Sequence, residues 1–230
     1  MRVLAAIWAI TLSTPLWADP CDELPKPSVT IKRIEEKIAF NTQYSYKSLT
    51  NMGAALARPG KQVLGLTRGN ASVSFSMNTP AFIDRTGHWE CSSPQITVTY
   101  GLSPITVYVA KEFPEGSCAY KEIYEHEMRH VKAYQTHIAD IEKLLADALN
   151  ARFATGSPWR GPVGQTRARL QQEMTERWTS FVQREFNRVE EAQARIDSPE
   201  EYERVANACD GEIKKRTRVD LHLKLTRDLH

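Results

Sequence analysis

Two long stretches of helical periodicity, separated by a short segment rich in Pro and Gly, constrain the fold of this 230-residue chain more than any other feature. Apolar residues recur at helical spacing from about residue 119 to 152 and from about 166 to 196, and neither stretch contains Pro or Gly. Residues 156–164 between them hold five Gly and Pro residues. Because long helices joined by a short connection pack antiparallel, the sequence predicts a long antiparallel helical hairpin.

The part of the chain before these helices has the periodicity of β-strands. Apolar and polar residues alternate over residues 71–77, 95–100 and 105–110, with Gly or Pro between the runs. This two-residue period is typical of half-buried strands. We predict that the last two runs form a β-hairpin through residues 101–104, within a small antiparallel sheet. A small antiparallel sheet followed by a helical hairpin makes the predicted fold class α+β.

The end of the second helical stretch is marked by Asp197, Ser198 and Pro199, and a short third helix is predicted to begin near Glu200. Apolar and polar residues alternate again over 219–225, which predicts that the tail returns as an edge strand. We expect one domain over residues 19–230. Its predicted parts are a sheet at about 25–112, a helical part at about 117–212 and a tail at 213–230.

The N-terminus has the pattern of a secretory signal peptide. Arg2 precedes an apolar run over residues 3–12, and Ala18 ends a short segment that fits a cleavage site. The apolar run is too short to span a bilayer, and no later segment is apolar enough to do so. We therefore predict a signal peptide over residues 1–18, a mature chain beginning near Asp19, and a secreted or periplasmic protein without a transmembrane segment.

Four cysteines follow the predicted cleavage site, namely Cys21, Cys91, Cys118 and Cys209. An even number in an exported protein predicts two disulfides, for which three connectivities exist. Cys91 and Cys118 flank the predicted strand pair, which favours a bond between them and leaves Cys21 for Cys209. The chain has no Cys-x-x-Cys, and this disfavours a thiolate zinc site or a redox active site.

Composition narrows the classes of function. The 30 Lys and Arg residues nearly balance the 28 Asp and Glu residues, so the chain lacks the basic excess of a nucleic-acid-binding protein. Five Trp, eight Tyr and seven Phe residues exclude a largely disordered chain. We expect a folded protein that does not bind nucleic acid.

Residues 126–130 read His-Glu-Met-Arg-His within the first predicted helix. His126 and His130 are one turn apart on one face, where neutral imidazoles can bind a single zinc ion, and Glu127 can take a proton from water. The alternative is a surface helix with solvated His and Glu side chains. Tyr134, one turn beyond His130, is either a donor to a developing oxyanion or an ordinary core residue.

A hydrolytic zinc site also needs a third protein ligand. His137 lies about 10 Å beyond His130 along an unbroken helix, which is too far. Glu185 lies near the centre of the apolar stripe of the second helix, where an unpaired carboxylate is costly, and roughly level with His130. We therefore predict Glu185 as the third ligand. A different helix register would pass this role to Glu173, Glu190 or a loop His, and pairing of Glu185 with an Arg is the competing interpretation.

Several segments carry a resemblance to a known family. They are Tyr44-Ser-Tyr46, Gly65-Leu-Thr67, the strand before Cys91, Phe113-Pro114, Cys118 and residues 126–130. Over residues 41–197, the chain resembles the bacterial secreted zinc-dependent proteases that are predicted from sequence, a family mostly catalogued as a domain of unknown function. That family has Gly at the position of Arg129, and only Asp197 and Tyr202 lie near the place of its C-terminal signature. The resemblance implies zinc binding and export.

These observations lead to three hypotheses about function. The first is an exported zinc metallopeptidase with a zincin-like fold that hydrolyses a protein or peptide substrate, with Glu127 as the general base. The second is a non-catalytic metal-binding envelope protein that keeps a zincin-like scaffold. The third is a zinc hydrolase that acts on another amide, such as a cell-wall crosslink.

Overall fold

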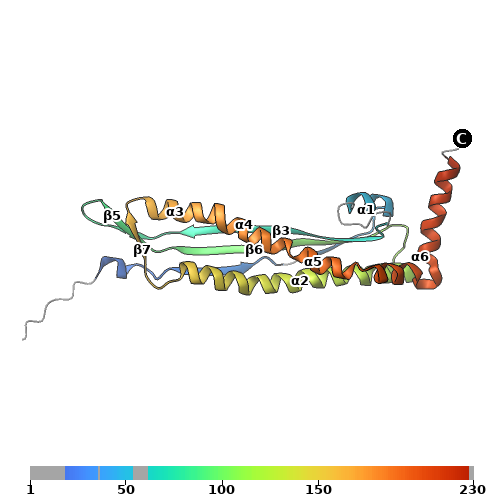
Figure 1. Cartoon of the computed structure of the whole chain (residues 1–230), viewed down its shortest axis with the longest axis horizontal. Helices are drawn as coiled ribbons and strands as arrows, with labels where there is room; N and C mark the ends of the chain where they lie inside the picture. The colour runs from blue at the N-terminus through green and yellow to red at the C-terminus, as the bar shows by residue number, and fades with distance from the viewer. Residues whose placement is uncertain (1–18, 36, 54–61, 228–230) are drawn as a thin grey trace, which may run out of the picture.

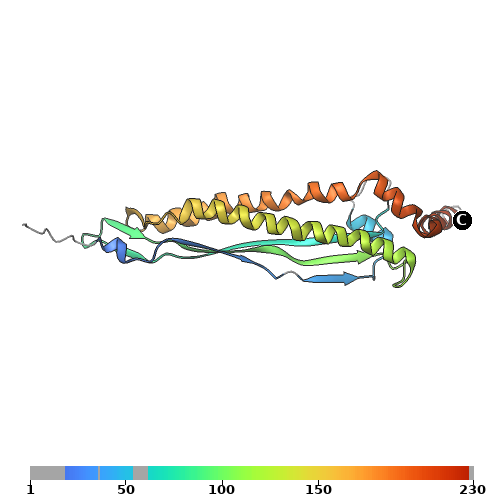
Figure 2. The same ribbon diagram turned by 90° about the horizontal axis from the view of Figure 1, so that it is seen from below.

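The computed structural model describes residues 19–35, 37–53 and 62–227, and it shows the α+β fold class that the sequence predicts. The molecule is elongated, with helices lying lengthwise on one face of a long sheet (Figures 1 and 2). The predicted signal peptide lies outside the described residues. None of the helices in the described part of the chain has the length and hydropathy that a membrane crossing requires.

The large sheet is organised around β6 (Gln95–Val109). β1 (Ser28–Arg33) and β2 (Ile38–Asn41) follow each other along one edge of β6, and both run parallel to it. β3 (Gly65–Asn78) pairs antiparallel with β6 on the other side. The sheet is therefore mixed, whereas the alternation in the sequence led us to expect an antiparallel sheet.

The predicted hairpin between residues 95–100 and 105–110 is wrong, because β6 continues through the intervening residues as one strand. Gly101 stays paired with Ser72 of β3, so this segment keeps its hydrogen-bonded neighbour without a reversal of the chain. A Cβ atom at Gly101 would lie 2.9 Å from the Cβ of Ile34. The glycine therefore permits a close approach of two segments and does not mark a turn.

The alternation in β6 decides which of its side chains contact the helices. Ile96, Val98 and Tyr100 are buried in the main hydrophobic cluster, together with residues of the long helices. The intervening positions Thr97 and Thr99 remain partly exposed. This burial of alternate side chains holds the helices on one face of the sheet (Figure 2).

The first predicted helix is α2 (Cys118–Phe153), which begins where the Ser117 side chain accepts a hydrogen bond from the Tyr120 N–H. The second predicted helix is divided in the structure. It consists of α3 (Gln165–Glu173), a π-helical turn η2 (Met174–Trp178), α4 (Thr179–Asn187) and α5 (Val189–Ile196).

Contacts at two levels show that this second series of helices runs antiparallel to α2. Arg152 donates to Glu173 near the C-terminal end of α2, and Gln193 donates to the carbonyl of His130 nearer its beginning. The end of α5 therefore lies beside the turn of α2 that carries the two motif histidines.

Shorter elements complete the two ends of the molecule. They are η1 (Pro20–Glu23), α1 (Tyr46–Met52) and a small sheet of β4 (Ala81–Ile83), β5 (Trp89–Ser92) and β7 (Trp159–Pro162). The segment rich in Pro and Gly between the long helices thus contributes an edge strand to this sheet. Pro162 fits this position, because Pro is tolerated in an edge strand.

The tail forms a helix, so our prediction of an edge strand over 219–225 is wrong. α6 (Pro199–Arg227) contains four non-helical residues from Ala208 to Gly211, at which the helix axis turns sharply (Figure 1). A helix satisfies its own backbone hydrogen bonds, whereas a strand needs a free sheet edge beside it. The predicted helix near Glu200 corresponds to the first part of α6.

The structure contains two disulfides and, among its described residues, no free cysteine, which confirms the predicted number. The predicted pairing is wrong, because Cys21 is bonded to Cys91 and Cys118 to Cys209. The long, unbroken β6 separates Cys91 from the start of α2, and this separation removes the reason for a Cys91–Cys118 bond. Two disulfides are typical of proteins that fold in an oxidising compartment such as the periplasm or the extracellular space.

Peptide mapping of the unreduced protein is therefore expected to recover Cys118 linked to Cys209. Replacing both of these cysteines by Ser should lower the free energy of unfolding by about 2 to 5 kcal/mol, because the bond closes a long loop in the unfolded chain. Chemical denaturation would measure this loss. Recovery of a fragment that links Cys91 to Cys118 would contradict the assignment.

Candidate metal centre

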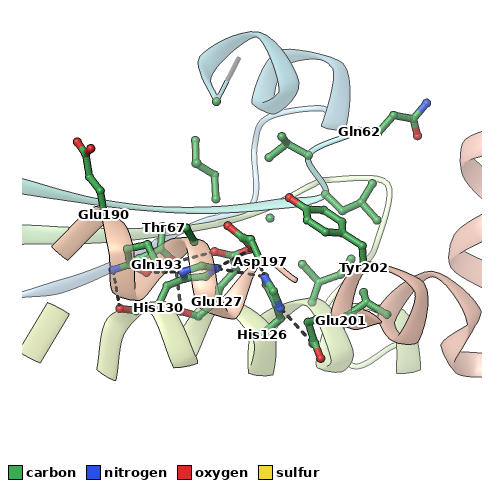
Figure 3. Close-up of a pocket in the computed structure, with 18 of the residues that line it drawn as sticks. Gln62, Thr67, His126, Glu127, His130, Glu190, Gln193, Asp197, Glu201 and Tyr202 are labelled. Carbon is green, nitrogen blue, oxygen red and sulfur yellow. Dashed lines mark hydrogen bonds and ion pairs between the residues drawn. The ribbon is translucent and has the colours of Figure 1, made fainter. Parts of the chain in front are cut away.

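The motif lies on the face of α2 that points toward β3 and α5. The helix places the imidazoles of His126 and His130 one above the other, with their Nε2 atoms 3.1 Å apart. Glu127, His126 and His130 form a group whose potential ligand atoms all lie within 4.8 Å of one another. The structure therefore brings together the three residues that the sequence motif predicts (Figure 3).

A third potential ligand comes from the residue that ends α5. Asp197 Oδ1 lies 3.1 Å from His126 Nε2 and 3.3 Å from His130 Nε2. Its position follows from the C-terminal cap of α5, where the Asp197 N–H donates to the carbonyl of Gln193. We did not predict Asp197 as a ligand, although it stood out in the sequence as part of the signal that ends the second helix.

The outer nitrogens of the two imidazoles are held by acceptors. The Gln193 amide donates through Nε2 to the His130 carbonyl, so its oxygen faces His130 Nδ1. Glu201 Oε1 lies 3.2 Å from His126 Nδ1. For neutral His130, the Gln193 oxygen favours the proton on Nδ1 and the lone pair on Nε2. His126 Nδ1 also lies 3.0 Å from Arg129 Nη2, which can only donate, so Glu201 and Arg129 favour opposite tautomers of His126.

Two imidazole nitrogens and one carboxylate oxygen thus converge on one point, where either protons on the imidazoles or a bound cation can balance the carboxylate. An ion bound tetrahedrally at about 2.0 to 2.1 Å from nitrogen and oxygen ligands separates those ligands by about 3.3 to 3.4 Å. The three edges of the His126, His130 and Asp197 triangle measure 3.1, 3.1 and 3.3 Å. Two imidazoles and one carboxylate are also a donor set that suits zinc. The residues present therefore fit a zinc ion.

The fourth residue of the site, Glu127, is almost completely buried, with 4% of its surface exposed. The Thr67 hydroxyl donates to its Oε2 at 2.7 Å, and Thr67 lies on β3. Gly65 on the same strand leaves the space for the carboxylate, since a Cβ there would lie 2.5 Å from Glu127 Oε1. The first residues of β3 therefore fix the Glu127 carboxylate beside the two imidazoles.

The electrostatics of the cluster favour a cation. Burial raises the pKa of Asp197, but contacts with His126 and His130 outweigh this effect and hold that pKa well below its usual range. Burial raises the pKa of Glu127, and the nearby imidazoles and the Thr67 hydroxyl lower it by less, so its pKa is raised overall. The negative charge of the Asp197 carboxylate is one that a divalent cation can balance.

The pKa of His130 is also raised. Burial by itself lowers this pKa, but hydrogen bonding to Asp197 and the charge of Glu127 outweigh it. The negative groups around His130 therefore favour a positive charge on this imidazole.

Arg129, which stands where the resembling family has Gly, has a structural role that we did not predict. It pairs with Glu201, which also accepts from Arg204 at 2.9 Å. Arg204 in turn donates to Glu122 of α2 at 2.7 Å. This network fastens the first turns of α6, and with them the acceptor for His126, to the helix that carries the motif.

A cavity of about 940 Å³ opens beside the cluster. Its walls come from β3, α2, α5 and both parts of α6, and they include Thr67, His126, Glu127, His130 and Asp197. Figure 3 shows Glu190 at one end and Gln62 and Tyr202 at the other, with the cluster between them. A substrate in this cavity would contact the cluster directly.

Glu185 lies away from this cluster, contrary to our expectation for the third ligand. Its carboxylate accepts from Arg188 Nη1 at 2.7 Å on the same helical face, and its carbonyl lies 2.7 Å from His137 Nε2. An ion pair with an Arg was the competing interpretation. Glu173 pairs with Arg152, so it too has a structural partner.

Two other candidates from the sequence lie in the cavity wall. Tyr134 is half-buried there, close to Gly69 of β3. Glu190 lines the cavity beyond His130. Neither residue belongs to the triangle of ligand atoms.

Replacing Gly65 by Ala is expected to lower the free energy of unfolding by about 1 to 3 kcal/mol, because the new methyl group overlaps the Glu127 carboxylate. Thermal or chemical denaturation would measure the change. Gly69→Ala on the same strand is the control, since its Cβ would approach Leu102 no closer than 3.4 Å. Equal losses in the two variants would contradict this role for Gly65.

Comparison of the chain with protein-family models, with curated proteins and with solved structures finds no match. The resemblance to the secreted zinc-dependent proteases therefore stays a prediction.

Proposed function

We propose that this protein is an exported zinc-dependent peptidase on a zincin-like scaffold, with the ion held by His126, His130 and Asp197. The observation that carries this proposal is the triangle of three potential ligand atoms, with edges of 3.1 to 3.3 Å, next to a buried carboxylate and a large cavity. The two disulfides and the predicted signal peptide support export.

A zinc ion bound there supplies Lewis acidity, which polarises a carbonyl group and makes water more acidic. Glu127 is the general base in this proposal. Its carboxylate takes a proton from the water whose oxygen attacks the carbonyl carbon, and returns a proton to the amine nitrogen when the C–N bond breaks. The products are a carboxylate and an amine, so no other reactant is needed.

The surrounding residues support this role of Glu127. The Thr67 hydroxyl holds one carboxylate oxygen, and burial raises the pKa of the carboxyl group toward the range in which it can both accept and donate a proton. Gln193 and Glu201 keep the imidazoles oriented, so the site is organised before a substrate binds.

Elemental analysis of the mature protein tests the proposal first. We expect about one zinc ion per chain in the wild type and none in His126→Ala. Wild-type protein should then release fragments from casein, lose this activity with a chelator and regain it with added zinc. Metal without turnover on peptides would favour a non-catalytic metal-binding protein, and release of fragments from peptidoglycan alone would favour a cell-wall amide hydrolase.

A further inference from the structure

We propose that the cavity selects short peptides with a positive group at one end and a negative group at the other, bound by Glu190 and Lys214 respectively. This inference rests on the proposed peptidase function, and it names the substrate class of the same site. Both side chains line the cavity that also contains the His126, His130 and Asp197 cluster.

Lys214 is the cation of the cavity wall. Of the described residues that line the cavity, it is the only Lys or Arg, and no ion pair with another described residue is recorded for it. It follows Ile213, which is buried with Ala119 and Ile123 of α2. The Cys118–Cys209 bond holds the bend of α6 at the beginning of α2, so Lys214 lies near this end of α2, before Glu127.

Glu190 is the matching anion at the other end. Burial raises the pKa of the Tyr134 phenol, and the negative charge of Glu190 raises it further, so these two groups are neighbours. Tyr134 lies one turn beyond His130 on α2. Figure 3 shows Glu190 at the end of the cavity opposite Gln62 and Tyr202.

The remaining acids of the cavity wall already have partners. Asp197 contacts the two imidazoles, Glu201 pairs with Arg129 and Arg204, and Glu127 accepts from Thr67. Glu203 also has a partner. Within the described part of the chain, Glu190 and Lys214 are therefore the charges of the cavity that lack an ion pair and remain available to a ligand.

The distance between Glu190 and Lys214 sets the length of the ligand. The levels of Ile123 and Tyr134 on α2 differ by eleven residues, or about 16 Å at the rise of an α-helix. An extended peptide advances about 3.3 Å per residue, so the two charges would be spanned by about five residues. The cluster lies between them, which places the cleaved bond inside such a peptide and not at its end.

The cavity wall also contains apolar side chains, namely Leu66, Leu102, Ile123, Phe186 and Val189. Apolar side chains in the middle of the peptide would therefore bury surface there. The charged groups of the ligand could be its free termini or acidic and basic side chains, since both present the same chemistry.

The test uses unlabelled pentapeptides with apolar central residues in four forms, with each terminus either free or blocked by acetylation or amidation. Hydrolysis of the mixed forms by the full mature protein, followed by mass spectrometry, gives relative kcat/KM values. We expect each free terminus to raise kcat/KM by about three- to tenfold, as for a partly exposed ion pair. Peptides that are blocked at both ends but carry a terminal Lys and a terminal Glu should show the same increase in kcat/KM if side chains supply the charges.

Lys214→Met should abolish the preference for the free carboxylate and keep the preference for the free amine, whereas Glu190→Gln should do the reverse. Lys215→Met and Glu191→Gln are matched controls, because these neighbours do not line the cavity, and both preferences should persist in them. Equal rates for all four forms with the wild type, or equal loss of all forms in the variants, would overturn the proposal.

Binding separates this proposal from the proposed function. Calorimetric titration of Glu127→Gln protein with the same four peptides should show the same order of affinities without turnover. If Glu127→Gln binds the peptides in a charge-dependent way but the wild type hydrolyses none of them, the peptidase function is contradicted and the recognition of charged ends is kept. If the wild type hydrolyses the peptides without any dependence on their charged ends, the peptidase function is kept and the recognition of charged ends is contradicted.

Discussion

Asp197→Ala is expected to lower the affinity for zinc by more than about a hundredfold. Loss of a group that only orients a ligand costs about ten- to a hundredfold, so loss of a ligand should cost more. Asp197 Oδ1 also lies between both imidazoles, and its removal leaves only two ligand atoms from the triangle. Competition with a chromophoric chelator measures the affinity of the purified variant.

Glu185→Gln is the control for this experiment, since its carboxylate pairs with Arg188. Its zinc affinity should match that of the wild type. Circular dichroism of both variants checks that the fold is kept. Unchanged affinity in Asp197→Ala, or strong loss in Glu185→Gln, would return the third-ligand role to the second long helix.

Glu127→Gln is expected to lower kcat by a factor of about 10² to 10⁴ and to leave the zinc content unchanged. The amide cannot accept the proton that the carboxylate takes, but it fits the same space beside Gly65 and can still accept from Thr67. Single-turnover hydrolysis of casein-derived peptides and elemental analysis of the same sample give both quantities.

Glu125→Gln provides a matched change on the same helix. Glu125 is exposed, and among the described residues it forms an ion pair with Lys121 alone. This control should keep both metal and activity. Loss of zinc in Glu127→Gln would instead make Glu127 a ligand, and full activity would exclude it as the base.

The residues that could be predicted from the sequence are those whose geometry is local. His126, Glu127 and His130 come together because one helix repeats every 3.6 residues, so their spacing alone places them on one face. The number of disulfides and the α+β class were predictable for similar reasons. Each of them depends on a count or on a short period along the chain.

Glu185 shows where a local pattern misleads. A carboxylate on an apolar helical stripe needs a partner, and this argument was correct. The partner, however, is Arg188, three residues away on the same helix, and not an ion held by α2. The stripe therefore predicted a charged contact for Glu185, but the helical projection could not identify the group that supplies it.

The tertiary structure alone decided the position of Asp197 beside the two histidines, the path of β6 and the cysteine pairs. Asp197 meets His126 and His130 because antiparallel packing brings the end of α5 across α2, a contact that joins residues 67 and 71 positions apart. The Cys118–Cys209 bond likewise joins the start of α2 to the bend of α6. Sequence periodicity specifies which face of an element is buried, whereas the register between distant elements depends on how their side chains pack together, and only the folded chain determines it.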